Sequence, residues 1–224
     1  MLINEVIILK IASLNIILLI ILLSCQEANI TPWYPPAIKP TEKDSIWGDY
    51  FPNTPGTEWE YNITVDDIYK GTVKIKIEKR VLLPDTNSAS KWNYEELGNK
   101  YSQYVAIIAD SVFFFYDISN LSNQIKKLKN YILPVNKFLD WNVRQLEQSF
   151  GNDIASGGSP IGSVTVPAGK FDNVYEIERI TDAQDRKAHE WIYFVPEVGM
   201  IRKETLDNST NKTIIWELKS YLIK

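Results

Sequence analysis

Hydrophobic and polar residues alternate along much of the chain after residue 50. The clearest stretch is Gly71–Val81, in which Val73, Ile75 and Ile77 are separated by charged residues. Successive side chains of a β-strand point to opposite faces, so this alternation predicts a strand with one buried and one solvated face.

Similar short segments recur, rich in β-branched and aromatic residues and bounded by Pro, Gly, Asn or Asp. Turn chemistry at Asp66-Asp67 and at Asp110 predicts hairpins, so we expect an antiparallel meander. The predicted strands are Thr57–Val65, Gly71–Val81, Tyr101–Ala109, Ser111–Ile118, Phe171–Ile180, Ala188–Val195, Gly199–Glu204 and Lys212–Leu222.

The remaining segments predict little regular structure. Ser119–Ile132 spaces its apolar residues at helical intervals and is predicted as a helix, whereas Asn136–Phe150 fits a helix or a strand. The Gly-rich stretch Gly157–Gly162 lacks the lysine of a phosphate loop and is interpreted as a flexible surface loop, and Thr181–Lys187 as a polar loop.

An almost uninterrupted apolar run, Ile11–Leu23, precedes Ser24-Cys25 near the N-terminus. This is the anatomy of a signal peptide, and Leu22–Cys25 resembles the lipobox of bacterial lipoproteins. The resemblance implies cleavage before Cys25, lipid on its thiol and attachment to a membrane. The alternative is an uncleaved membrane helix that ends by chance in a cysteine.

Three segments follow from this interpretation: a signal peptide at residues 1–24, a lipidated cysteine with a Pro-rich tether at residues 25–49, and a single β-domain at residues 50–224. Cys25 is the only cysteine, so the mature domain can form no internal disulfide. Gln26 after the cysteine favours the outer over the inner membrane of the cell envelope, with the domain in the periplasm or at the cell surface.

Three motifs resemble one group of proteins. They are an FP-x-x-x-G-x-x-W-x-Y stretch from Phe51 to Tyr61, a VPAG turn at Val166–Gly169, and a YF-x-P-x-VG-x-I stretch from Tyr193 to Ile201. The motifs resemble uncharacterised bacterial envelope lipoproteins, which are similar to lipoprotein-carrier-like half-barrels. The resemblance implies a mainly β fold, a strongly curved antiparallel sheet forming a half-barrel or open barrel, with one or two short helices. It also favours a strand in Asn136–Phe150.

Composition narrows the function classes. The formal net charge of −4 and the pI near 5.2 argue against a nucleic-acid surface, and the basic cluster Lys126–Lys129 is interpreted as a solvated face. His189 is the only histidine, so we predict no metal site, no cofactor and no enzyme activity. A polysaccharide hydrolase stays an alternative because carboxylates are present at Asp66-Asp67, Glu95-Glu96, Asp182 and Asp185.

Aromatic residues are the remaining signal, with 7 Trp, 12 Tyr and 8 Phe. They either fill the core or line an apolar cavity within a curved sheet. The candidate ligand-binding residues are Phe113, Phe115, Trp141, Trp191 and Trp216. We therefore expect a membrane-anchored protein that binds a lipid, another hydrophobic ligand or an envelope protein partner, with a structural or assembly subunit of an envelope complex as the alternative.

Overall fold

The computed structural model describes residues 47–48, 50–83, 87–116, 127–144 and 151–224 of the chain. The predicted signal peptide, Cys25 and most of the predicted tether therefore lie outside the described residues. No helix among the described residues is long and apolar enough to cross a membrane.

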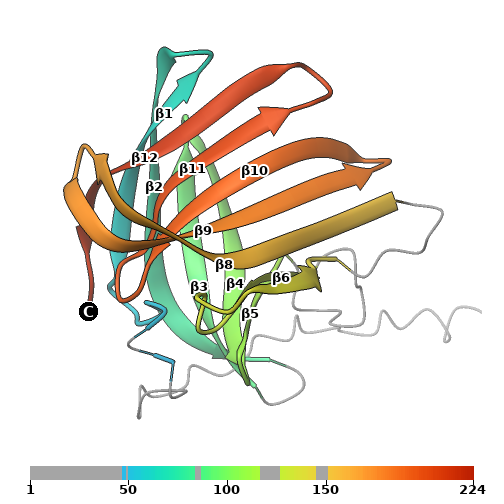
Figure 1. Ribbon diagram of the computed structural model, residues 1–224. Coiled ribbons are helices and arrows are strands. Elements are labelled where there is room, and N and C mark those ends of the chain that lie inside the picture. Colours follow the sequence, from blue (N-terminus) through green and yellow to red (C-terminus); the bar gives the residue numbers. More distant parts are fainter. Residues whose placement is uncertain (1–46, 49, 84–86, 117–126, 145–150) are drawn as a thin grey trace, which may run out of the picture. The chain divides into compact units, whose positions relative to one another are not determined.

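The described residues form one sheet of twelve antiparallel strands, without a helix (Figure 1). Its first half comprises β1 (Glu58–Val65), β2 (Ile68–Leu82), β3 (Ser88–Glu96), β4 (Asn99–Ile108), β5 (Ser111–Phe115) and β6 (Lys127–Ile132). Its second half comprises β7 (Leu139–Asn142), β8 (Gly151–Val166), β9 (Gly169–Ala183), β10 (Arg186–Val195), β11 (Gly199–Asp207) and β12 (Lys212–Leu222).

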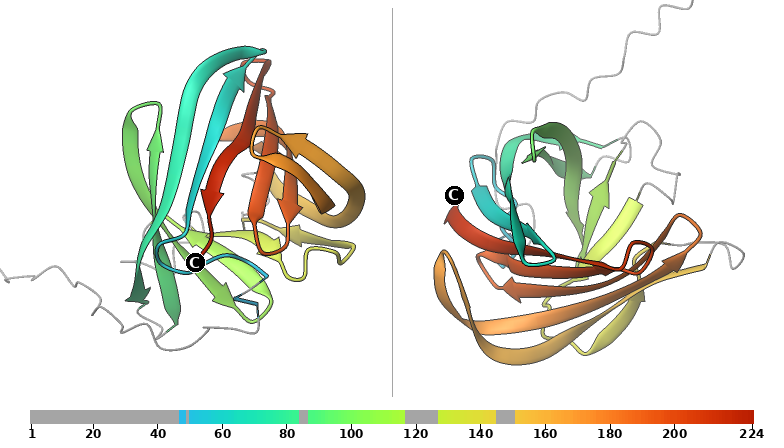
Figure 2. Two further views of the ribbon diagram at one scale, coloured as in Figure 1. Left: turned by 90° about the vertical axis from the view of Figure 1, so that its left-hand side faces the viewer. Right: turned by 90° about the horizontal axis from the view of Figure 1, so that it is seen from above.

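The strand order is β6-β5-β4-β3-β2-β1-β12-β11-β10-β9-β8-β7. Each half is a meander of consecutive hairpins, and the pairing of β1 with β12 joins the two halves into one sheet. This confirms the predicted antiparallel meander and the strongly curved sheet. Figure 2 shows the strands wrapping around a common interior.

The two edges of the sheet, β6 and β7, meet at a short seam. The backbone N–H of Lys129 donates to the carbonyl of Val143 at 2.9 Å, and the indole Nε1–H of Trp141 donates to the carbonyl of Lys129 at 2.8 Å. The curved sheet therefore comes close to a closed barrel, and the seam pairs backbone groups that two free edges would leave unpaired.

Alternation determines which side chains face the interior. Val73, Ile75 and Ile77 of β2 are buried, as their spacing predicts, together with Trp59 and Tyr61 of β1. Because the chain can form no disulfide in this domain, burial of apolar surface is the main contribution to its stability.

The predicted hairpin turns are present. Asp66 and Asp67 both have positive φ, at 50° and 63°, which is the backbone of the two-residue turns that match strand twist. The turns at Asp110 and at Pro167-Ala168 also connect neighbouring strands, as predicted.

The helix predicted for Ser119–Ile132 is wrong in its described part, because Lys127–Ile132 forms β6. The pairing with β5 shifts between Val112 and Phe113, so Asn130 is an extra, bulged residue. The bulge separates the buried residues Leu128 and Tyr131 by three positions instead of two, which imitates helical spacing. Residues 119–126 lie outside the described part.

The surface loop predicted for Gly157–Gly162 is also wrong. This stretch lies within β8, and the register with β9 shifts three times across it. A Cβ on Gly158 would lie 2.5 Å from the carbonyl oxygen of Lys137, and its φ is +102°. The glycine therefore permits a bulge against a close backbone neighbour rather than a loop. Leu139–Asn142 of the ambiguous segment is a strand, and Thr181–Lys187 is mostly strand around a tight turn.

Candidate functional site

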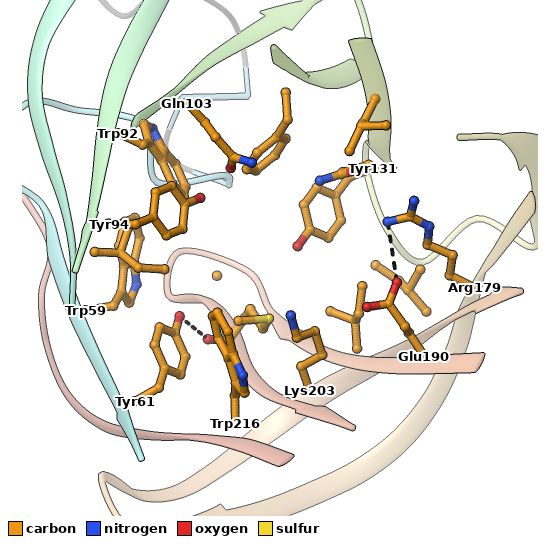
Figure 3. A pocket seen from close by; sticks show the side chains of 18 of the residues that line it. Trp59, Tyr61, Trp92, Tyr94, Gln103, Tyr131, Arg179, Glu190, Lys203 and Trp216 are labelled. Carbon is orange, nitrogen blue, oxygen red and sulfur yellow. Dashed lines mark hydrogen bonds and ion pairs between the residues drawn. The ribbon is translucent and has the colours of Figure 1, made fainter. Parts of the chain in front are cut away.

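A cavity of about 210 Å³ lies inside the curved sheet (Figure 3). Every strand of the first half and strands β8 to β12 contribute lining residues. The aromatic residues that line it are Phe51, Trp59, Tyr61, Trp92, Tyr94, Tyr101, Phe114, Tyr116, Tyr131 and Trp216.

Hydrogen bonds hold the aromatic wall in place. The indole of Trp59 donates to the carbonyl of Val198 at 2.8 Å, and the hydroxyl of Tyr61 donates to the carbonyl of Met200 at 2.9 Å. The rings of Trp59 and Trp92 are 5.0 Å apart. Because their polar atoms are already bonded, these side chains present apolar surface to the cavity.

The segment before β1 closes one end of the interior. Phe51 stacks against Trp92 and Phe194 at ring distances of 6.0 Å. The side chain of Asn53 accepts the indole N–H of Trp92 at 2.8 Å and donates to the carbonyl of Val105. Asn53 therefore holds this segment in place as a plug, and Phe51 and Pro52 of the segment form part of the cavity wall.

Partly exposed residues mark the open side of the cavity. Tyr101 of β4 and Tyr116, which directly follows β5, are 38% and 53% exposed, and Arg186 at the start of β10 is also exposed. The ring of Tyr101 stacks on that of Tyr94 at 4.8 Å. A molecule entering from solvent would therefore meet tyrosine rings and a guanidinium group.

Charged groups occupy one side of the cavity. Glu190 is only 4% exposed, and its Oε1 accepts hydrogen bonds from Arg186 at 3.0 Å and Thr205 at 3.3 Å. Its Oε2 lies 3.4 Å from Nη1 of Arg179. Burial acts to raise the pKa of Glu190, but Lys203 and the two arginines outweigh it and lower that pKa. Glu190 is therefore a carboxylate at neutral pH.

Asp153 anchors these charges from behind. It is 1% exposed, and its carboxylate accepts hydrogen bonds from Arg144 at 2.6 Å, from Arg179 at 2.7 and 2.8 Å, and from Thr181 at 3.2 Å. Arg144 also forms a bidentate pair with Asp185. Burial acts to raise the pKa of Asp153, but the two guanidinium groups lower it overall. The result is a rigid network that orients Arg179.

Lys203 of β11 extends into the cavity beside this network (Figure 3). Its ammonium lies 3.9 Å from the ring centre of Trp216, which is within cation–π distance. Desolvation lowers the pKa of Lys203, against the opposing field of Glu190. A cation therefore lies at the junction of the aromatic wall and the charged side.

Two polar atoms of the lining lack a hydrogen-bond partner among the described residues. They are Oδ1 of the bulged Asn130 and Oε2 of Glu190. Buried acceptors normally have a donor, so these two atoms indicate where a water or a ligand donor would bind.

The predicted site residues separate into two groups. Trp216 lines the cavity, whereas Phe113, Phe115, Trp141 and Trp191 do not. Phe113 and Phe115 lie on the face of β5 opposite Phe114, with Phe115 in a second, smaller apolar cluster. Trp141 is buried at the seam, and Trp191 stacks on His189 on the other face of β10 from Glu190.

The charged residues of the cavity were missed by the sequence analysis. Arg179, Glu190 and Lys203 each lie two positions from a buried apolar residue, namely Ile177, Ile192 and Ile201. Strand periodicity alone would have placed them on the inner face, so a charged residue in phase with buried ones was the available signal.

The other sequence candidates occupy separate places. His189 bonds to Glu178 at 2.5 Å outside the cavity, as an ordinary strand residue would. Among the described residues, no three His, Cys, Asp or Glu side chains form a group that could hold a metal. The predicted carboxylates Asp66-Asp67, Glu95-Glu96, Asp182 and Asp185 are absent from the cavity lining.

Comparison with known proteins identifies only distant structural similarity. No protein-family profile matches the chain, and neither does any curated protein. Two solved structures are similar, each over 77% of this chain and 98% of its own, with a TM-score of 0.47. One is a candidate exported protein with a YmcC-like fold from Bacteroides fragilis at 12% identity, and the other a candidate lipoprotein from Parabacteroides distasonis at 16% identity. Neither is named as a lipoprotein carrier, so that resemblance stays a prediction.

Proposed function

We propose that this protein is a lipid-anchored lipoprotein of the bacterial cell envelope that binds a small hydrophobic molecule inside its curved sheet, without catalysing a reaction. The cavity is the observation that carries the binding part of the proposal. The lipobox at Leu22–Cys25 supports the anchor.

The construction of the cavity supports a ligand rather than an imperfect core. The indoles of Trp59 and Trp92 contact each other, are fixed by hydrogen bonds and line the cavity without filling it. Ligand pockets combine such apolar walls with a few converging polar groups, as Glu190 and Lys203 provide here.

The volume limits the size of the ligand. Pockets for drug-sized molecules measure about 300–1,000 Å³, and an apolar cavity of about 150 Å³ accommodates benzene. A cavity of about 210 Å³ therefore fits a molecule with a single ring, or a chain of similar bulk.

Two variants in which a buried alanine is replaced by leucine test the proposal. Ala155 lines the cavity, whereas Ala106 is buried in the separate cluster with Phe115. We expect Ala155→Leu to fill part of the cavity and to remove a ligand that co-purifies with the processed chain, as measured by native mass spectrometry. We expect Ala106→Leu to keep the ligand and to lose about 1–3 kcal/mol of stability through overpacking.

Two results would contradict the proposal. One is a wild-type chain, purified from its own envelope, that carries no ligand and gains none from an extract of that envelope. The other is an Ala155→Leu variant that keeps the wild-type ligand at full occupancy.

A further inference from the structure

The charges around the cavity nearly balance. Three arginines and three carboxylates form a continuous set of ion pairs, with nitrogen-to-oxygen distances between 2.6 and 3.4 Å. Its members are Arg144, Arg179, Arg186, Asp153, Asp185 and Glu190. Three positive and three negative charges cancel, so the network itself needs no counterion.

Lys203 is a further cation that does not belong to this charge-balanced network. Within the part of the chain that the structure describes, its ammonium contacts the ring of Trp216 and forms no ion pair with a carboxylate. Glu190 acts on it electrostatically, but the oxygens of that carboxylate already face Arg186 and Arg179. A desolvated ammonium that forms no ion pair with a carboxylate is costly, so its place in an aromatic cavity favours the binding of an anion.

The unbonded acceptors add a second requirement. Oε2 of Glu190 and Oδ1 of Asn130 lie in the same lining as Lys203 and accept no hydrogen bond from the described residues, although Oε2 forms an ion pair with Nη1 of Arg179 at 3.4 Å. An anion alone would pair with Lys203 and leave these two oxygens without a hydrogen bond. A ligand that also carries a hydroxyl or N–H group would satisfy both.

We propose that the ligand is a small organic acid with a ring or a short apolar body and a hydrogen-bond donor, and that Lys203 binds its anionic group. This rests on the proposed binding function and specifies its ligand class. The apolar body lies against Trp59, Trp92 and Trp216, and the donor meets Glu190 or Asn130. An acid of this kind matches the cavity in size, charge and polarity.

Matched probes test the assignment. 4-Hydroxybenzoate carries a ring, an anion and a hydroxyl donor, and 4-hydroxybenzamide has the same shape without the charge. We expect the ligand-free processed chain to bind the acid at least about tenfold more tightly than the amide, by isothermal titration calorimetry. Lys203→Met should abolish that preference while the amide still binds, and Lys203→Arg should restore part of it.

The control variant is Lys219→Met, which also removes one positive charge. Lys219 pairs with Glu60 outside the cavity, so we expect the tenfold preference to stay. Equal loss of the preference in Lys219→Met and Lys203→Met would overturn the assignment to Lys203 and leave a general effect of net charge.

The remaining outcomes separate this inference from the proposed function. If acid and amide bind equally well to the wild-type chain, the anion assignment is wrong, but the cavity still binds ligands. If neither probe binds and the chain purified from its envelope carries no ligand, both proposals are wrong. A co-purified ligand that is neutral would overturn the anion assignment alone.

Discussion

Asp153 is the residue on which the charged side of the cavity depends. Two guanidinium groups converge on its buried carboxylate, and one of them, that of Arg179, extends to the cavity lining. Removing one member of a buried ion pair leaves the others unpaired in a poorly solvated place. The stability of the domain and the position of Arg179 are therefore coupled through one side chain.

We expect Asp153→Asn to lower the free energy of unfolding by about 3–5 kcal/mol. The control is Asp182→Asn, at an exposed carboxylate on the neighbouring strand, which should change stability by less than about 0.5 kcal/mol. Urea denaturation at neutral pH measures both. An Asp153→Asn variant as stable as the Asp182→Asn variant would contradict the role given to the network.

The same carboxylate makes stability depend on pH. The folded pKa of Asp153 lies below its ordinary value, so its contribution is fully present above an unfolded pKa of about 3.9 and is lost as the pH falls through the folded pKa. We therefore expect the wild-type chain to lose stability below about pH 4 and Asp153→Asn to lose less over the same range.

Individual residues also show why the sequence predicted the cavity lining only in part. Trp216 was predicted as a cavity residue and lines the cavity. On β5, however, Phe113 and Phe115 were predicted to line it, and Phe114 between them does so instead. In a run of consecutive aromatic residues, both faces of the strand are apolar, so hydrophobicity cannot distinguish the inner from the outer side. The charged cavity residues were detectable in principle, because each interrupts an apolar face.

At the scale of strands, regular alternation was a reliable guide. The predicted segments from Thr57–Val65 to Lys212–Leu222 that show period-2 alternation all contain strands. The errors occurred where bulges change the period, as at Asn130 in β6 and across Gly157–Gly162 in β8. β3 was not predicted at all. A bulge depends on the partner strand, which local sequence does not reveal.

The seam between β6 and β7 depends on few contacts, and Trp141 is central to them. Its indole donates to the carbonyl of Lys129, and its ring packs over Gly157 of β8. We expect Trp141→Phe to keep most of the packing, to leave that carbonyl unpaired and to lower stability by about 1–3 kcal/mol. Hydrogen exchange should accelerate most at the backbone amide of Lys129.

Trp191→Phe is the matched control for the seam. Trp191 is half-buried on the outer face of β10, and the structure gives its indole no hydrogen bond. The exchange rate of the Lys129 amide should stay at the wild-type value in this variant. A seam that exchanges equally fast in wild type and Trp141→Phe would show that the indole does not hold the edges together.

At the scale of the whole molecule, the lipid anchor is inferred from the sequence, whereas the cavity is observed in the structure. Cys25 lies outside the described residues, so its lipidation rests on the lipobox alone. We expect Cys25→Ser to prevent lipid attachment and cleavage before residue 25, as followed by labelling with a fatty-acid analogue and by the mass of the protein. Normal labelling of the serine variant would contradict the anchor.

The interior of the curved sheet links these scales. The curved sheet, the segment before β1 and a balanced set of ion pairs surround a cavity in which Lys203, among the described residues, forms no ion pair with a carboxylate. The fold class could be predicted from local patterns, whereas membrane attachment stays a prediction. The cavity could not be predicted, because it depends on which strands face one another across the interior.

The most direct test of this account is the electron density inside the sheet in crystals of the processed chain purified from its own envelope. We predict density for one small molecule between Trp59, Trp92 and Trp216, with an acidic group at the ammonium of Lys203. An interior closed by rearranged side chains, or one that holds only ordered water, would contradict the account.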